Sequence, residues 1–324
     1  SGAVAAGREG LGNPEPRRDI PYRQMLAAVG QSRLMHTYQE MFSEHKLILA
    51  QALLTRNDID DWQGYLNVRD TLLSLLSMGV VPIINENDVV NTEELGAEMF
   101  GDNDTLSALV SNLVDADLLI MLTDIDGLYT SDPRIDESAE FIPLVSEKNV
   151  NQIIDILGNK ETLHSWSRGG IKTKIEAAML ATRWGVEVVI ASGLHPDVLY
   201  RVVNGDSEGT IFKPSANKME SRKRWFLSGV STKGKIIVDG GAAKALKKTG
   251  SLLPVGVQEV HGGFQRRDVV LIVDNQGQNV AYGIANYSAR DVDLIKGLRS
   301  SGIEDKLGHE YGAEVVHRNN LVML

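Results

Sequence analysis

The stretch that decides the fold is Leu106–Leu122, which reads LSALVSNLVDADLLIML. Its first part repeats apolar residues at the spacing of one helix face, namely Leu106, Leu109, Val110, Leu113 and Val114. Its second part, Leu118–Leu122, is a short unbroken apolar run, which is typical of a strand covered on both faces. A helix followed at once by a buried strand predicts an α/β unit.

The same alternation extends through the first two-thirds of the chain. Three more short apolar runs lie at Lys46–Gln51, Val80–Ile84 and Val186–Ala191. Helical patterns occur between them, over Tyr22–His45, around Leu72–Leu76 and over Ile175–Thr182. We therefore expect a three-layer α/β/α fold with a mostly parallel sheet, whose ligands bind beyond the carboxyl ends of the strands.

The sequence changes character after about Thr210, which predicts a second domain. Lys213–Arg224 is polar and aperiodic, and short strand-like stretches with glycine-containing turns follow it. Residues 222–324 contain 15 Lys and Arg against 10 Asp and Glu, whereas the whole chain has 33 against 43. We expect a large domain over residues 1–220, a linker over 221–230 and a small β-rich domain over 231–324.

The composition excludes several classes of function. The 324 residues contain no cysteine, which rules out disulfides, thiolate catalysis and cysteine-bound metals. No apolar run approaches the roughly 20 residues of a membrane helix, and no secretory signal opens the chain. The seven histidines form no paired metal motif, so we expect no protein-bound metal. This composition fits a cytoplasmic protein.

Two polar loops are candidates for ligand binding. In Asn85-Glu86-Asn87-Asp88, which follows a predicted strand, Asp88 suits a ligand ammonium and Asn85 suits a carboxylate. A polar turn with side-chain capping explains the same residues equally well. Before the Leu106 helix stand Asp102, Asn103 and Asp104, which are ordinary N-terminal capping residues but also mark a place where free N–H groups meet an anion. Two such loops at strand ends of one sheet favour a shared site.

Two further loops suit a nucleotide. The string TDIDGLYTSDP at Thr123–Pro133 follows the Leu118 strand, although its parts also read as simple turns. Arg168–Lys174, RGGIKTK, opens a helix with paired glycines, lysines and threonine, which suits a phosphate. It lacks the Walker spacing, and a flexible surface loop is the alternative interpretation. Lys174 is unfavourable for the dipole in the first helical turn, which indicates an anionic partner.

Over essentially its whole length the chain resembles the amino acid kinase family, and within it the kinases that act on L-glutamate. The strings that carry the resemblance are SGAVAAGRE at Ser1–Glu9, LAAVGQSRL at Leu26–Leu34, VPIINENDVV at Val81–Val90, GDNDTLSALV at Gly101–Val110, LTDIDGLYTSDP at Leu122–Pro133 and GGIKTKIEAA at Gly169–Ala178. From Arg222 onward the chain is similar to the PUA domain.

The resemblance implies a reaction and assigns residues to it. ATP would phosphorylate the side-chain carboxylate of L-glutamate, giving γ-glutamyl phosphate, the first step of proline synthesis, with Mg²⁺ on the ATP phosphates. Lys174 would stabilise the transferring phosphoryl group and Asp104 would orient catalytic lysines. The residues implied for glutamate are Ser1, Asn85, Asp88, Asp102 and Asn103. Those implied for ATP are Thr123, Asp124, Arg168, Gly169, Gly170, Ile171, Lys172, Thr173 and Lys174. Proline is implied as feedback inhibitor, and a dimer or tetramer as the assembly.

The chain departs from the family pattern at its start. The family opens with a strand and a loop that brings a phosphate-binding lysine, whereas Ser1-Gly2 corresponds to the end of the next strand unit. We expect these 324 residues alone to be inactive or poorly folded, and a form with that segment restored to be active. The loop over Val89–Phe100 is also longer than is usual in the family.

Two alternatives remain open from the sequence. The first is another member of the same family, acting on acetylglutamate, aspartate, carbamate or a nucleotide. The second is an RNA-binding or regulatory protein that acts through its PUA-like domain and has a defective kinase domain. The positive charge of residues 222–324 favours this second alternative.

Overall fold

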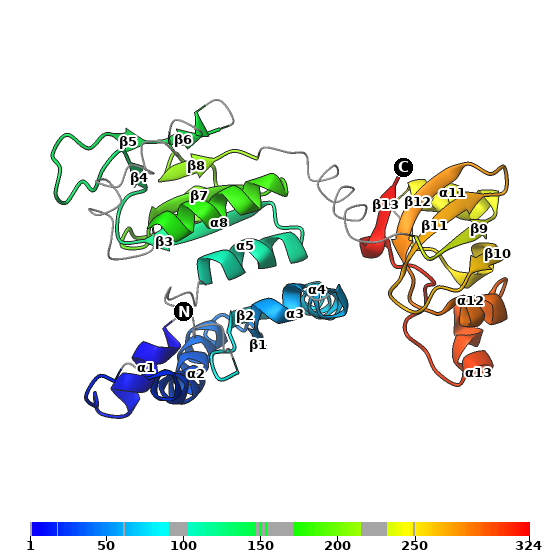
Figure 1. Cartoon of the computed structure of the whole chain (residues 1–324), viewed down its shortest axis with the longest axis horizontal. Helices are drawn as coiled ribbons and strands as arrows, with labels where there is room; N and C mark the ends of the chain where they lie inside the picture. The colour runs from blue at the N-terminus through cyan, green and yellow to red at the C-terminus, as the bar shows by residue number, and fades with distance from the viewer. Residues whose placement is uncertain are drawn as a thin grey trace. The chain divides into compact units, whose positions relative to one another are not determined.

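The structure, a computed structural model, describes residues 2–17, 19–60, 62–90, 103–146, 149–150, 153, 171–214, 232–248 and 250–324. The chain divides into two compact units, Ser1–Asn217 and Lys218–Leu324 (Figure 1). Within the described ranges, no helix combines the length and the apolar character that crossing a membrane requires.

The N-terminal unit alternates helices and strands, as predicted. Its helices are α1 (Ala3–Gly10), α2 (Ile20–Ser43), α3 (Arg56–Asp60), α4 (Trp62–Ser77), α5 (Asn103–Leu113), α8 (Ile171–Arg183) and α9 (Val198–Val203). Its strands are β1 (Leu49–Leu54), β2 (Val81–Glu86), β3 (Leu118–Thr123), β4 (Leu128–Tyr129), β5 (Phe141–Ile142), β6 (Leu144–Val145), β7 (Glu187–Ser192) and β8 (Thr210–Phe212). The predicted α/β class is confirmed, with β1 beginning three residues later than the apolar run that indicated it.

The strands of this unit pair mainly in parallel. β1 pairs with β2 in parallel, and a second sheet has the order β3-β7-β8-β6, in which only β7 and β8 are antiparallel. In the described residues β2 and β3 share no ladder, so β1 and β2 form a pair apart from the four-stranded sheet. The short strands β4 and β5 form a separate antiparallel pair.

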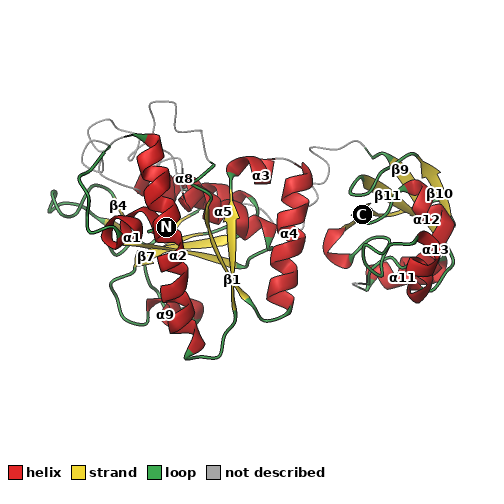
Figure 2. Ribbon diagram, turned by 90° about the horizontal axis from the view of Figure 1, so that it is seen from below, coloured by secondary structure: helices red, strands yellow, loops and turns green. Residues whose placement is uncertain are grey.

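Strand β7 shows why the fold has layers. Its alternate residues Val188 and Ile190 are fully buried in one apolar cluster with residues of α8, including Ala178. The intervening residues Val189 and Ala191 join another cluster with residues of α9. Successive strand side chains point to opposite faces, so one strand buries both faces at once. Figure 2 shows α8 and α9 on opposite sides of β7.

Helices α1 and α2 pack against each other through two glycines (Figure 1). A Cβ atom on Gly30 would lie 1.7 Å from the carbonyl oxygen of Ala3, and one on Gly7 would lie 1.9 Å from that of Leu26. Only glycine permits such an approach of two backbones. This contact fixes the start of α1.

The C-terminal unit is built on a five-stranded sheet with the order β10-β9-β11-β12-β13. The sheet is antiparallel except between β9 and β11. Its strands are β9 (Gly234–Val238), β10 (Val257–Gly262), β11 (Val269–Asp274), β12 (Asn279–Ile284) and β13 (Leu321–Met323). Its helices are α11 (Gly240–Lys247), α12 (Ala289–Ile295) and α13 (Ile303–Leu307), with 3₁₀ turns at Pro254–Gly256, Ser300–Gly302 and Arg318–Asn320.

This unit has its own apolar core. Ile236, Ile272 and Val292 are fully buried together in it. The hydroxyl of the buried Tyr287 donates a hydrogen bond to the carbonyl of Gly312 at 2.5 Å, which satisfies its polar end. The sequence prediction of a small β-rich domain is confirmed.

Candidate active site

The centre of the candidate site is an ion pair between two helix starts. The Nζ of Lys174 donates to both carboxylate oxygens of Asp104, at 2.9 and 3.0 Å. Both side chains are mostly buried, with 17% of Lys174 and 20% of Asp104 exposed. The hydroxyl of Thr173 donates to the same carboxylate at 2.8 Å. Asp104 therefore holds the lysine and the threonine in one orientation.

The helices explain this geometry. Asp104 lies in the first turn of α5, where a negative charge is favoured, and Lys174 lies in the first turn of α8, where a positive charge is not. Because α5 and α8 pack side by side, the carboxylate of one helix start compensates the ammonium of the other. The ion pair holds the lysine side chain in a partly buried place, which suits it to an anionic ligand.

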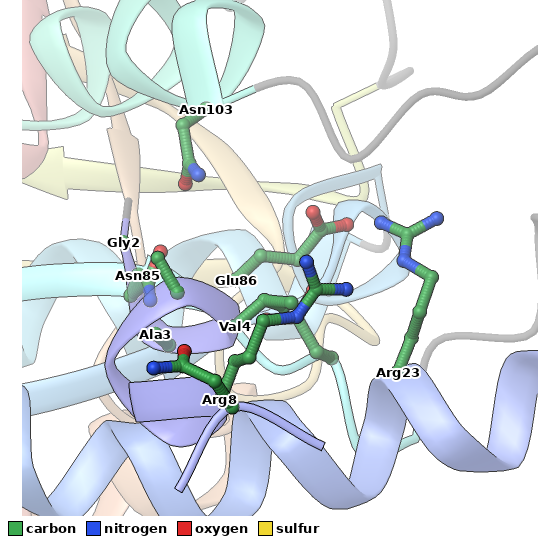
Figure 3. Close-up of a pocket in the computed structure, with 11 residues that line it drawn as sticks. Gly2, Ala3, Val4, Arg8, Arg23, Asn85, Glu86 and Asn103 are labelled. Carbon is green, nitrogen blue, oxygen red and sulfur yellow. The ribbon is translucent and has the colours of Figure 1, made fainter. Parts of the chain in front are cut away.

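A cavity of about 590 Å³ reaches the start of α5 at Asn103, the residue before Asp104 (Figure 3). Asn85, Asp88 and Asn103, three of the residues expected to bind the acceptor, line it. Its complete lining is Gly2, Ala3, Val4, Ala5, Arg8, Asn13, Arg23, Asn85, Glu86, Asp88 and Asn103. The structure thus brings together the loop after β2 and the start of α5, although β2 and β3 share no ladder.

The amide of Asn85 is held from behind the cavity. Asn85 is 3% exposed, and its Nδ2 donates to Oε1 of Gln31 on α2 at 2.9 Å. This hydrogen bond fixes the orientation of the Asn85 amide. Sequence reasoning did not identify Gln31, because a glutamine on a helix has no distinctive spacing.

The residues expected to bind the nucleotide start at the end of β3. Thr123 ends the strand, and its hydroxyl donates to Asp124 at 3.2 Å. Asp124 also accepts from Arg134 at 3.2 Å, on a surface where both side chains are exposed. The loop after the strand therefore folds back onto its own beginning.

Arg134 organises this loop through a second carboxylate. It donates to Asp132 from its backbone and from two side-chain nitrogens, at 3.0, 3.0 and 2.9 Å. The Asp132 side chain is 2% exposed. Hydrogen bonds from Arg134 hold the pKa of Asp132 below its ordinary value of about 3.8. The Asp132 carboxylate therefore stays charged inside the loop. The sequence analysis did not identify Asp132 or Arg134 as residues that organise this loop.

The other predicted nucleotide residues differ in their placement. Ile171 is buried in the core, so its side chain is not exposed to a ligand. Lys172 is exposed and lies 3.8 Å from Glu176 on the outer face of α8. Five predicted site residues fall outside the part of the chain that the structure describes: Ser1, Asp102, Arg168, Gly169 and Gly170.

Arg8 and Arg23 also line the cavity, and sequence reasoning did not single them out. The only sequence signal for Arg8 is its position four residues after Val4, on the same face of α1. Within the described residues, no group of three or more acidic or histidine side chains is placed to hold a metal ion.

Comparison with known proteins defines the class to which this fold and site belong. Residues 2–192 match the amino acid kinase family, and residues 234–307 match the PUA domain. The chain therefore belongs to the amino acid kinase family.

Among its members, the chain is similar to glutamate 5-kinases. It is 49% identical over 327 residues to the glutamate 5-kinase of Dehalococcoides mccartyi (strain CBDB1), covering 100% of this chain and 86% of that protein. It is 50% identical over 323 residues to that of Herpetosiphon aurantiacus, covering 99% and 86%. It is 48% identical over 325 residues to that of Moorella thermoacetica, covering 100% and 84%.

Proposed function

We propose that this protein transfers the γ-phosphoryl group of ATP to the side-chain carboxylate of L-glutamate. The products are γ-glutamyl phosphate and ADP, and the reaction is the first step of proline synthesis. The observation that carries the proposal is the Asp104–Lys174 pair, whose neighbour Asn103 lines a cavity, in a chain about half identical over its full length to glutamate 5-kinases.

This reaction requires stabilisation of the charge on the transferring phosphoryl group, and it requires no general base. A side-chain carboxylate is already ionised at neutral pH, so one of its oxygens can attack the γ-phosphorus directly. The bond between that phosphorus and the bridging oxygen breaks, and its electron pair leaves with ADP. Because two anions must approach in line, catalysis rests on position and on nearby positive charge. Lys174, held by Asp104, would supply that charge at the transferring group.

The cavity would hold the acceptor. Asp88 would bind the ammonium group, while the amides of Asn85 and Asn103 would bind carboxylate oxygens. Asn103 precedes Asp104 directly, so a carboxylate at Asn103 would be close to Lys174. Family correspondence adds Ser1 and Asp102 to the acceptor site.

The nucleotide would lie over the loop after β3 and the start of α8. Thr123, Asp124 and Arg168–Lys174 are the proposed ATP-binding residues. Mg²⁺ is proposed as the partner of the ATP phosphates, since this ion commonly keeps its waters and binds substrate phosphates with few protein ligands. The absence of a cluster of three candidate ligands among the described residues is compatible with such binding. The ion would neutralise part of the phosphate charge.

Regulation, assembly and location are further proposals drawn from the family. We propose proline as a feedback inhibitor, a dimer or tetramer as the assembly, and the cytoplasm as the location. RNA binding by the C-terminal unit is a second candidate function, supported by the excess of basic residues over 222–324. RNA binding that weakens with salt would support it, and no binding at low salt would dismiss it.

The decisive test traps the acyl phosphate with hydroxylamine in the presence of ATP, Mg²⁺ and glutamate. The assay is run on this chain and on a form preceded by the strand and lysine loop of the family. Hydroxamate from either form supports the proposed reaction. If both forms are folded and neither gives hydroxamate with glutamate, the proposal is wrong, and acetylglutamate, aspartate and carbamate are tried next.

A further inference from the structure

Two arginines line the cavity in addition to the residues proposed above to bind the acceptor. Arg8 comes from α1 and Arg23 from α2, and both line the cavity together with Glu86 of β2. Figure 3 shows the guanidinium groups of both arginines extending toward the Glu86 carboxylate. Asn103 enters the same cavity from another side, on α5. The two arginines therefore lie on one side of the cavity and Asn103 on another (Figure 3).

The Arg8 side chain has an unused hydrogen-bond donor. Its Nε is enclosed by protein and has no hydrogen-bond partner in the structure. Buried polar groups normally have a partner, because a donor removed from water without an acceptor costs free energy. An oxygen-bearing ligand in the cavity would supply the acceptor.

The Arg8 side chain and the N-terminus of α1 face the same cavity. Val4 and Arg8 are four residues apart on α1 and both line the cavity. Helical side chains lean toward the N-terminus, so the guanidinium of Arg8 returns along the first turn. That turn, Gly2–Ala5, also lines the cavity, and first-turn N–H groups cannot bond within their own helix. Arg8 and the start of α1 together form a place for an anion.

The charges of the lining indicate which kind of ligand fits. The lining contains two positive side chains, Arg8 and Arg23, and two negative ones, Glu86 and Asp88. A ligand that carries both an ammonium group and carboxylates matches this mixed lining, because complementary charges give specificity.

We propose that Arg8, supported by Arg23, binds the α-carboxylate of the acceptor and thereby makes the enzyme select α-amino dicarboxylates. The proposal rests on the proposed glutamate kinase function. The side-chain carboxylate is then directed toward Lys174, since the α-carboxylate is held at the opposite wall. A planar guanidinium suits this task because it can give two parallel hydrogen bonds to one carboxylate.

The test compares three acceptors in the hydroxamate assay, using the form of the protein that is active with glutamate. 4-Aminobutyrate is glutamate without its α-carboxylate, and glutarate is glutamate without its ammonium group. We expect Arg8→Gln to lower kcat/KM for glutamate and for glutarate by about 10- to 100-fold, the effect of losing a hydrogen bond to a charged group. The value for 4-aminobutyrate should fall less than about threefold.

Two companion variants separate recognition from folding. Arg8→Lys keeps the charge without the planar fork, so it should recover part of the loss with glutamate. Arg33→Gln removes an exposed arginine of α2 outside the cavity and should leave all three acceptors unchanged. Thermal unfolding of each variant is measured alongside.

The outcomes distinguish this proposal from the proposed function. An equal loss with all three acceptors in Arg8→Gln, or no loss with glutamate, overturns the role of Arg8. Absence of glutamate phosphorylation in both folded forms of the protein without substitutions overturns the function itself and is seen before any variant is made. A selective loss with glutamate and glutarate supports both.

Discussion

Lys174 Nζ lies 2.9 Å from Asp104 Oδ1, and this contact joins the first turn of α8 to the first turn of α5. The two residues are 70 positions apart in sequence. Their pairing places a lysine of the proposed nucleotide loop directly beside a residue of the acceptor loop.

Removal of the lysine should act mainly on the chemical step. We expect Lys174→Met to lower kcat about 1000-fold with a smaller change in KM for glutamate, as for loss of a donor that stabilises transition-state charge. Asp104→Asn should lower kcat less, by about 10- to 100-fold, since it keeps an oxygen near the lysine. Steady-state hydroxamate kinetics measures both. Lys213→Met, which breaks an exposed pair with Glu187, is the control, and wild-type kcat in Lys174→Met would contradict the assignment.

The contact between α1 and α2 should tolerate no side chain at Gly30. In Gly30→Ala the new Cβ would lie 1.7 Å from the carbonyl oxygen of Ala3, so the helices must separate. We expect a destabilisation of about 3 kcal/mol, the upper range for overpacking, together with weaker glutamate binding because α1 lines the cavity. Chemical denaturation and KM measure these effects.

Gly10→Ala is the matched control for that substitution. Gly10 ends α1, the helix that packs against Gly30, and the atoms nearest to its Cβ would belong to the flexible side chain of Arg33, the first at 2.8 Å. We expect it to be neutral or to stabilise by up to about 1 kcal/mol, since alanine favours a helix over glycine. Equal stability of the two variants would show that the close backbone approach does not exist.

Arg69 should be important for the position of α5. This residue of α4 is 4% exposed, and its side chain donates to the carbonyl of Leu113 and to Asp115. We expect Arg69→Met to destabilise the protein by about 2 kcal/mol, because a helix-end carbonyl and a carboxylate lose a charged donor. Arg56→Met, which breaks an exposed pair with Asp60, should cost less than about 0.5 kcal/mol. Denaturation curves that shift equally for both variants would count against this role of Arg69.

The Asp132–Arg134 contact should make the free energy of unfolding depend on pH in the acidic range. The folded-state pKa of Asp132 is held below its unfolded value of about 3.8, so its contribution is present above that pH and is lost as pH falls through the folded pKa. Arg134→Gln removes the main cause of the shift and leaves burial, which raises the pKa. The variant should therefore begin to lose stability at a higher pH than the unaltered protein.

Thermal unfolding between about pH 3 and pH 6, the range around an ordinary aspartate pKa, tests this prediction. Arg56→Gln is the control, since it makes the same substitution at an arginine that forms an exposed pair with Asp60 elsewhere in the unit. Parallel pH profiles for the Arg134→Gln variant and the unaltered protein would show that Arg134 does not control the ionisation of Asp132.

The sequence by itself determined the fold class, the family and most of the elements. Periodicity is a local property, so the apolar stripe from Leu106 to Val114 and the run Leu118–Leu122 predict α5 and β3 within a few residues. The two-domain division is likewise visible in local composition. The motif strings carry the family resemblance, and the comparisons confirm it.

Only the tertiary structure decided which of these residues meet. No spacing rule pairs Asp104 with Lys174, because the contact depends on how α5 packs against α8. The close approach of Gly30 to Ala3, which sets the start of α1, is equally invisible in the chain. The packing of α1 against α2 also brings Arg8 and Arg23 to one cavity. The sequence pattern of neither helix predicts a ligand-binding residue. Local patterns specify the elements, and the burial of their apolar faces specifies which polar side chains are brought together.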